Sequence, residues 1–379
     1  MKILHIIPDL RKGGAERLVI DIIRELSIRP GVTASIIIFR DSIEYKTDGI
    51  RASIHVIPSS VNLSILRTSE YNISDLQKFI DSYKPDIIHS HLAEAEIVSR
   101  SIYYPHAKWF SHCHDNMIVF KNEGRKALFN KKLFTRLFEK KYLLKRYDEN
   151  GGTHFVAVST NTLNYFKENL PANKYIVTLL SNAIDLSRIK PKQNTTQKNK
   201  LTLINIGSFV KNKNQQFLTR IIQEILSRGI ECDCIMLGSG PEEENVKKLS
   251  QEIGISNNVR FEGNVEDVGV YLSQSDIYVH TAFSESFGLV LLEAMGTGLP
   301  TVSLDNGGNN DIIQNGVNGY ILPQPDAKLF ADKIIGIFQD RNLYDTISQR
   351  GLESVKKYDI QAYTSQLLNI YEEDLKAHH

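Results

Sequence analysis

The stretch SDIYVHTAFSESFGLVLLEAMGTGLPTVSLD, residues 275–305, decides the fold. An apolar run that ends near Thr281 predicts a buried strand, and the polar residues around Glu285 predict a turn. A helix is expected to begin near Phe287 and to stop before the Gly-Thr-Gly sequence, and a second strand follows at 301–304. A strand, a helix and a strand in this order predict parallel pairing with a right-handed crossover.

The same alternation extends in both directions. In the second half, further strands are expected at 201–206, 232–237 and 259–262, with helices starting near Lys213, Glu242 and Ala327. In the first half, strands are expected at 1–8, 34–39, 86–89, 108–111, 155–158 and 175–179, with helices between them. The fold class is therefore α/β, with two doubly wound, Rossmann-like halves.

The two domains are expected at 1–192 and 198–357, because the polar segment 189–200 has no apolar periodicity and suits a linker. A last helix is expected over 358–379, and we predict that it packs back on the first domain. Ligands of open α/β sheets bind beyond the carboxyl ends of the strands, so two such domains would face a central cleft.

The composition excludes several classes of protein. The 379 residues carry 45 Lys and Arg against 44 Asp and Glu, so no global charge draws the chain to nucleic acid. Three cysteines without a Cys-x-x-Cys spacing fit a reducing compartment. The first apolar run, Ile3 to Ile7, is too short for a signal peptide or a membrane span, so we expect a cytoplasmic protein.

The helix expected after the Glu285 turn has the features of an anion site. The N–H groups of Phe287, Gly288, Leu289 and Val290 would have no partner within the helix, and the helix dipole adds positive charge there. With Ser286 on the preceding turn, this helix start is expected to hold a diphosphate.

Glu285 and Glu293 are eight residues apart and would lie on a similar side of this segment. Carboxylates accept hydrogen bonds from vicinal hydroxyl groups, so the pair could hold two sugars, as in a nucleotide sugar. The alternative is structural: Glu285 would serve the helix dipole, and Glu293 would lie on a solvated face.

Several motifs together resemble the retaining glycosyltransferases of family 4, which have the GT-B fold. They are the Glu-x7-Glu pair within the stretch above, Gly307-Gly308 with Asp311, Asn318-Gly319, and three glycine-containing segments. These segments are GGAE at 13–16, GSFVKNKN at 207–214 and LGSGPEEE at 237–244. The resemblance covers nearly the whole chain and is loose at 117–152 and 193–200.

The resemblance implies roles for individual residues of the second half. Glu285 would contact the hydroxyls of the donor sugar, Glu293 the ribose, and Lys213 the diphosphate. The nucleobase would meet main-chain atoms of the turn formed by Glu262, Gly263 and Val265.

Gly238 of the Gly-x-Gly-Pro segment would also line the donor site. Two positions depart from the family pattern, since Ser208 stands in place of an arginine and Ser286 in place of a glycine. The first change removes a bidentate phosphate clamp, and Lys211 is a candidate substitute.

In the first half, the resemblance places His114 beside the transferred sugar as a positioning or catalytic residue. Gly14 would let the donor phosphate or the acceptor approach the following helix, or it is simply a tight turn. A zinc interpretation of His112 and His114 lacks a partner set in the sequence. His89 and His91, at another strand end, could line the cleft or cap a turn.

Taken together, the resemblance implies an enzyme that transfers a sugar from a UDP- or GDP-linked donor to a glycan or polyprenyl-diphosphate-linked acceptor in polysaccharide synthesis. No Asp-x-Asp pair occurs, so we expect no metal and no other cofactor. The alternatives are a non-hydrolysing sugar-nucleotide epimerase of the same architecture and a two-domain solute-binding module.

The segment 121–146 is basic and amphipathic. It has ten lysines and arginines against two glutamates, with aromatic and aliphatic residues at helical spacing. This pattern suits either an ordinary packed helix or a helix that meets an anionic membrane surface or a lipid-diphosphate acceptor. On the second interpretation, the protein is peripheral on the inner face of the membrane.

Overall fold

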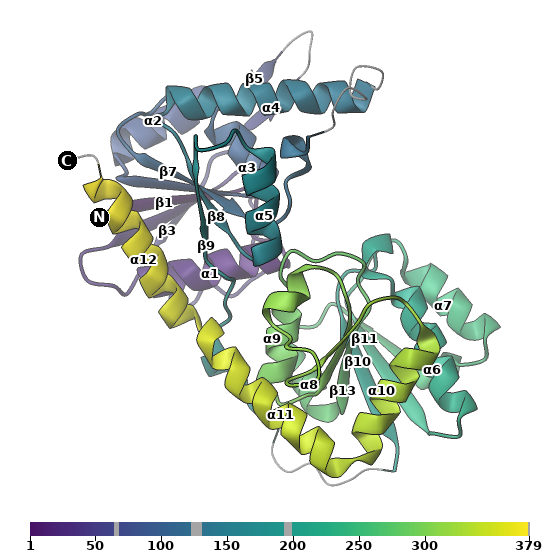
Figure 1. Ribbon diagram of the computed structural model, residues 1–379. Coiled ribbons are helices and arrows are strands. Elements are labelled where there is room, and N and C mark those ends of the chain that lie inside the picture. The colour runs from purple at the N-terminus through teal and green to yellow at the C-terminus, as the bar shows by residue number, and fades with distance from the viewer. Residues whose placement is uncertain (64–67, 123–130, 193–198, 378–379) are drawn as a thin grey trace. The chain divides into compact units, whose positions relative to one another are not determined.

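The computed structural model describes residues 1–63, 68–122, 131–192 and 199–377, which form two α/β units (Figure 1). The first unit contains Met1–Ala183 and the chain from Ile360 on, and the second contains Ile184–Asp359. Each unit is built on a parallel sheet, which confirms the predicted class of two doubly wound halves.

Seven strands in the described part of the first unit form a parallel sheet in the order β3-β2-β1-β6-β7-β8-β9. These strands are β1 (Lys2–Ile7), β2 (Thr33–Ile38), β3 (Ser53–Val56), β6 (Ile87–His91), β7 (Lys108–Cys113), β8 (His154–Ala157) and β9 (Ile176–Leu179). The helices are α1 (Gly14–Leu26), α2 (Ile73–Tyr83), α3 (Leu92–Ser99), α4 (Lys131–Glu149), α5 (Thr160–Asn169) and α12 (Ile360–Lys376). Strands β4 (Ser60–Asn62) and β5 (Ser69–Tyr71) form a separate antiparallel pair.

Both faces of this sheet are covered, because alternate residues of its central strand enter different cores. Ile3 and Ile7 of β1 pack in one core with apolar residues of α1 and α12. Leu4 and Ile6 pack in another core with residues of α2 and α3. Burial on both faces explains the nearly continuous apolar sequence of the strand.

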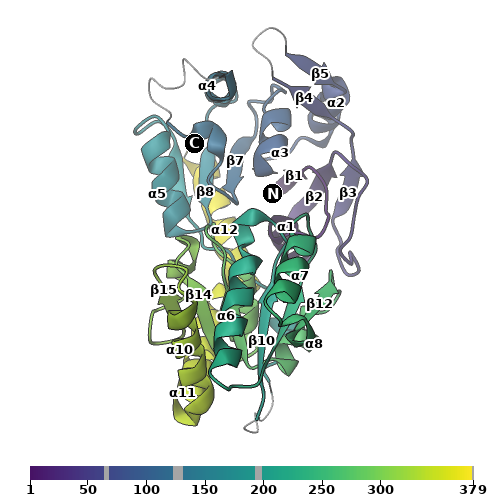
Figure 2. The same ribbon diagram turned by 90° about the vertical axis from the view of Figure 1, so that its right-hand side faces the viewer.

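The second unit has a sheet of six described strands in the order β12-β11-β10-β13-β14-β15. These strands are β10 (Leu201–Ile206), β11 (Cys232–Leu237), β12 (Val259–Gly263), β13 (Ile277–His280), β14 (Thr301–Leu304) and β15 (Tyr320–Leu322). The helices are α6 (Gln215–Ser227), α7 (Glu243–Glu252), α8 (Val268–Gln274), α9 (Leu289–Gly296), α10 (Ala327–Gln339) and α11 (Arg341–Val355). Figure 2 shows α6 and α10 in front of this sheet, and both contribute to its main core.

The strand order reverses at the first strand of each sheet. In the first unit β1 lies between β2 and β6, and in the second unit β10 lies between β11 and β13. Connections that leave two such neighbouring strands run in opposite directions and leave a crevice at the carboxyl ends, where ligands of this fold class bind. A ligand site is therefore expected at the loops after β10 and β13.

The boundary between the units differs from the predicted one. Ile184 N donates to Tyr358 O (3.0 Å), and Lys192 Nζ donates to Ser275 O (2.6 Å), so the segment that begins at Ile184 already belongs to the second unit. The core of the predicted linker, 193–198, lies outside the described residues. Helix α12 packs in one core with α1, so the chain returns to the first unit at its end.

In the part of the chain that the structure describes, every helix is too short or too polar to cross a lipid bilayer.

Candidate functional site

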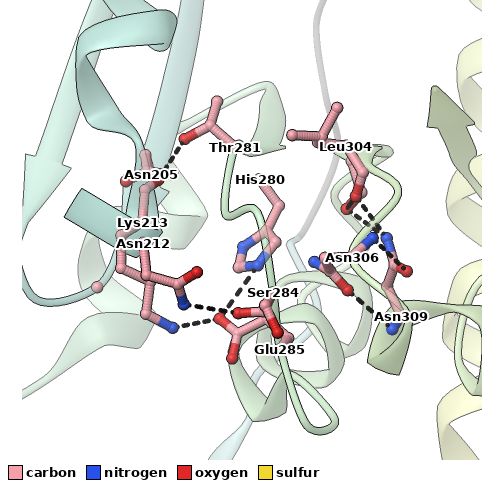
Figure 3. A network of polar contacts seen from close by, with 12 residues as sticks. Asn205, Asn212, Lys213, His280, Thr281, Ser284, Glu285, Leu304, Asn306 and Asn309 are labelled. Carbon is pink, nitrogen blue, oxygen red and sulfur yellow. Dashed lines mark hydrogen bonds and ion pairs between the residues drawn. The ribbon is translucent and has the colours of Figure 1, made fainter. Parts of the chain in front are cut away.

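A lysine and a glutamate form an ion pair where the strand order of the second unit reverses (Figure 3). Lys213 ends a short 3-10 turn, Lys211–Lys213, that follows β10, and Glu285 lies in the loop that follows β13. Their side chains are 25% and 15% exposed, respectively, so the pair is largely shielded and still open to a ligand. The structure thus brings together two residues separated by more than 70 positions in the sequence.

His280, the last residue of β13, extends this pair into the interior. Its Nε2 lies 3.3 Å from Glu285 Oε1, and its Nδ1 lies 3.0 Å from the hydroxyl of Tyr278. Tyr278 and His280 are both buried and lie on the same face of the strand, as alternation requires. One oxygen of the Glu285 carboxylate, Oε1, therefore contacts both a buried imidazole and an ammonium group.

These neighbours keep Glu285 ionised. Burial by itself raises the pKa of this carboxyl, but the hydrogen bond to His280 and the charge of Lys213 outweigh it and lower the pKa from 4.5 to about 2. The site therefore presents a carboxylate, which accepts hydrogen bonds from hydroxyl groups, throughout the neutral pH range.

The loops that carry Lys213 and Glu285 are tied together by main-chain contacts. Asn212 Nδ2 donates to Ser284 O (2.7 Å), and Phe283 N donates to Asn212 O (2.8 Å). Thr281 Oγ1 donates to Lys213 O (2.9 Å). The ion pair therefore lies on a frame that does not depend on the pair itself.

The loop after β14 supports Glu285 from the other side. Glu285 N donates to Asn306 O (3.2 Å), and a Cβ added at Gly308 would lie 2.5 Å from Glu285 O. Asn309 Nδ2 donates to Leu304 O (2.7 Å), which fixes this loop to the end of its strand. Only glycine allows such a close approach of two backbones.

Helix α9 begins later than the sequence indicated. Gly288 has a φ of +98° and precedes the first helical residue, Leu289, because the left-handed conformation cannot continue into the helix. Phe287 is 2% exposed, and its ring lies 5.6 Å from that of Tyr358. The predicted start at Phe287 is therefore wrong: its side chain anchors the loop to the core.

The other residues predicted at this helix start are all partly exposed. Ser286, Leu289 and Val290 are half-buried beside it in the sequence, and Glu293 is half-buried on α9. Burial, and then the charges of Glu285 and Glu293, raise the pKa of the buried Tyr278. Both carboxylates thus act on the same buried phenol, and their position on one side of the segment stays a prediction.

The predicted phosphate-loop residues are exposed and lie on a braced loop. Ser208 and Lys211 are exposed, and Gln215 Nε2 donates to Ser208 O (3.1 Å). Gly238 N donates to Gly263 O (2.8 Å), so two predicted donor-site segments adjoin each other. Glu262 lies near the end of β12 and Val265 in the loop that follows it, and both are half-buried.

Gly14 and His114 belong to the first unit. Gly14 is the first residue of α1, next to Gly13, whose N–H donates to the hydroxyl of Tyr45 (2.9 Å). His114 follows β7, and its Nε2 lies 2.9 Å from His91 Nδ1. A common site of His114 with Glu285 and Lys213 stays a prediction.

Two family models match adjoining parts of the chain. The model described as "Glycosyltransferase Family 4" matches residues 12–188, and the model "Glycosyl transferases group 1" matches residues 187–354. The chain belongs to the family 4 glycosyltransferases.

Curated relatives match this family 4 glycosyltransferase over part of their length. N-acetyl-alpha-D-glucosaminyl L-malate synthase of Bacillus anthracis is 31% identical over 229 residues, which are 58% of this chain and 59% of that protein. Phosphatidyl-myo-inositol mannosyltransferase of Mycobacterium leprae is 30% identical over 159 residues, 40% and 42% of the respective chains. The chain thus spans about half the length of these relatives.

Solved structures share the fold over almost the entire chain. A glycosyltransferase from Rickettsia africae has a TM-score of 0.76 at 20% identity and covers 99% of this chain and 98% of its own. HepE from Anabaena, in complex with UDP-glucose, has a TM-score of 0.77 at 18% identity, with 98% and 100% covered. These similarities confirm the GT-B fold of this family 4 glycosyltransferase.

Sequence reasoning missed several residues of the candidate site. His280 and Tyr278 could have been found, since the last residues of a strand before a polar turn point toward the ligand end of the sheet. The sequence contains no pattern that would identify Asn212 and Asn306. Each contacts a main-chain group of another loop, and that contact exists only in the folded chain.

Proposed function

We propose that the protein is a retaining glycosyltransferase that moves a sugar from a UDP- or GDP-linked donor to a glycan or lipid-linked acceptor in polysaccharide or glycoconjugate synthesis. The observation that carries the proposal is the Lys213–Glu285 ion pair at the strand reversal of the second unit. Family membership and the nucleotide and nucleotide-sugar complexes of HepE support it.

The ion pair supplies both charges that such a donor needs. The Glu285 carboxylate accepts hydrogen bonds from sugar hydroxyls, and the Lys213 ammonium neutralises the departing diphosphate. Glu293 is proposed to bind the ribose, and the main chain around Gly263 the base. Lys211 and the N–H groups of Leu289 and Val290 add positive potential for the phosphates, so we propose that transfer needs no metal.

His114 and Gly14 are proposed to act on the sugar or the acceptor from the first unit.

For the acceptor side we propose contact with an anionic membrane surface through 121–146, which would make the protein peripheral on the cytoplasmic face. Phe134 and Leu137 of α4 are 41% and 38% exposed and lie among basic residues, which suits such a surface. Lys140 has an internal role, since its Nζ donates to Phe120 O (2.7 Å) and Asn169 O (2.8 Å). Residues 123–130 of this segment lie outside the described chain.

The proposal is tested by calorimetry of UDP and GDP and by turnover of their sugars. Lys213→Met is expected to weaken binding of the preferred diphosphate by roughly 10–100-fold, because a charge-assisted contact contributes about 1.5–3 kcal/mol. Lys248→Met, which removes an exposed lysine of α7, is the matched control and should leave the affinity unchanged. Transfer should persist in excess chelator, and proton NMR of the product should show the anomeric configuration of the donor.

Other outcomes would separate the alternatives. Interconversion of the donor sugar without release of nucleoside diphosphate would indicate an epimerase, and binding of a sugar without any reaction would indicate a binding module. Equal diphosphate affinities of Lys213→Met and the wild type would remove the basis of the proposed donor site.

A further inference from the structure

Five histidines gather at the carboxyl ends of the central strands of the first unit. They are His5 of β1, His89 and His91 of β6, His112 of β7 and His114 just after β7. The strand register pairs His5 with His89 and His91 with His112. Neighbouring rings stack at centroid distances between 4.2 and 5.2 Å. None of these contacts belongs to the ion-pair site of the second unit.

The hydrogen bonds of this cluster leave nitrogen lone pairs without partners. His91 Nε2 lies 2.8 Å from His5 Nδ1, and His91 Nδ1 lies 2.9 Å from His114 Nε2. His112 Nε2 lies 3.4 Å from the hydroxyl of Tyr363. Within the described chain, His112 Nδ1 has no partner at full hydrogen-bond geometry, although the Asn182 side chain interacts with this ring and the residue is 2% exposed. A buried, unsatisfied polar atom of this kind requires an explanation.

We propose that His91, His112 and His114 bind one transition-metal ion of the zinc type. Each ring offers one nitrogen, and these three nitrogens all lie within 4.8 Å of one another. Three imidazoles with one open position are a common zinc ligand set, and imidazole also suits copper and nickel. His114 is the half-buried member and gives the ion a route from solvent.

The groups around these three rings match the outer contacts of a metal site. When His91 binds through Nδ1, its Nε2–H donates to His5 Nδ1, and when His112 binds through Nδ1, its Nε2–H faces Tyr363. Such partners fix the tautomer and the orientation of a ligating histidine. The Asn182 side chain, which interacts with the His112 ring, has an oxygen that can accept from a metal-bound water.

Metal binding requires one ring to turn. The rings of His112 and His114 are stacked at 4.2 Å with 10° between their planes, so their lone pairs cannot both point at one ion. On binding the ion, His114, which follows the end of the strand, would turn and exchange its hydrogen bond with His91 for the shared cation.

The other cluster with suitable nitrogens consists of His5, His89 and His91. All three are fully buried, and the hydroxyl of Tyr371 already occupies His89 Nδ1 at 2.5 Å. This set offers no route for an ion, so the site that includes His114 is the one we propose.

The test uses the full chain without an affinity tag, freed of metal by dialysis against a chelator. Calorimetry with Zn²⁺ is expected to show one ion per chain, and Co²⁺ is expected to give the strong visible absorption of a tetrahedral site. His114→Gln and His112→Gln should abolish this binding. His5→Gln should weaken it by roughly 10–100-fold, as loss of an outer partner does.

The matched control is His106→Gln, which removes an exposed histidine of the same unit. A chain that ends at Ala377 controls for the terminal histidine pair. Because His112→Gln alters a buried position, circular dichroism must show that this variant is folded. If it does not fold, loss of Zn²⁺ binding in His114→Gln, which alters a half-buried position, tests the proposal by itself. Absence of stoichiometric binding at micromolar Zn²⁺, or binding that survives both replacements, would overturn the proposal. Neither result depends on glycosyl transfer.

Discussion

The charge state of Glu285 leads to a prediction that can be measured without knowing the substrate. Glu285→Gln keeps the shape of the side chain and removes its charge. The folded-state pKa of about 2 lies below the ordinary value of 4.5, so the ionised carboxylate stabilises the fold above pH 4.5. This stabilisation is lost as the pH falls toward 2. The difference between the two values corresponds to roughly 3 kcal/mol at neutral pH.

Hydrogen exchange measured by mass spectrometry can report on the second unit alone, through peptides that cover β13 and α9. At pH 7 the opening free energy of these peptides should be lower in Glu285→Gln than in the wild type by up to about 3 kcal/mol. The gap should narrow to roughly half by pH 3, after correction for intrinsic exchange rates, because below pH 4.5 the carboxyl of the opened state takes up a proton while the folded carboxylate stays ionised.

The control is Glu252→Gln, which removes an exposed carboxylate at the end of α7. It should change the exchange of β13 and α9 little at either pH. A gap for Glu285→Gln that stays constant between pH 7 and pH 3 would refute the reasoning, since it would mean that shape rather than charge is responsible. No gap at all would mean that Lys213 and His280 do not stabilise the carboxylate.

Three further predictions follow from the described contacts. Lys211→Ala should weaken binding of the preferred nucleoside diphosphate a few-fold, as expected for an exposed charge, and unchanged calorimetric affinity would exclude this lysine as a substitute for the missing arginine. Gly308→Ala should lower the free energy of unfolding of the second unit by about 1–3 kcal/mol, because the new Cβ would collide with Glu285 O, and a thermal midpoint equal to that of the wild type would contradict this. Replacing the exposed Phe134 and Leu137 of α4 by serine should reduce co-sedimentation with anionic vesicles, and binding that is unchanged, or insensitive to salt, would argue against a membrane surface there.

The sequence allowed the core strands of the second unit to be predicted with correct bounds, because strands buried on both faces read as continuous apolar runs. Strands β10, β11, β13 and β14 are of this kind. β3 and β15 were not predicted: β3 is partly exposed, and β15 has only three residues. Short or half-exposed edge strands depend on pairing with a neighbour and carry little periodicity of their own.

The candidate site could be predicted to the extent that it is local in sequence. The segment around Glu285 contains its turn and its helix, so the acidic residue and the anion-binding helix start could be proposed together. The exact start of α9 could not be predicted, because it depends on the packing of Phe287 against Tyr358. Family resemblance assigned Lys213 and Glu285 separate roles in the donor site. Their ion pair was not predicted, because it depends on β10 and β13 being neighbours.

The histidine cluster shows the same limit in the other unit. His112 and His114 could be placed on one side of a strand by alternation, but their partners come from β1 and β6. Those partners are specified only by the order and register of the sheet. The sequence alone therefore offers no partner set for a zinc site, although the proposed ligands lie on or directly after the neighbouring strands β6 and β7.

The two units share a strand order, and in both the chemically distinctive residues lie where that order reverses. In the second unit the loops after β10 and β13 hold an ion pair, and in the first unit β1 and β6 hold stacked imidazoles. The same topology thus places an ion pair at the strand reversal of one sheet and a cluster of stacked imidazoles at that of the other. Zn²⁺ that occupied His114 would withdraw that residue from the role proposed for it in transfer. Zn²⁺ should therefore inhibit a glycosyltransferase that needs His114, and His112→Gln should relieve the inhibition. Inhibition that persists in His112→Gln would show that zinc acts elsewhere.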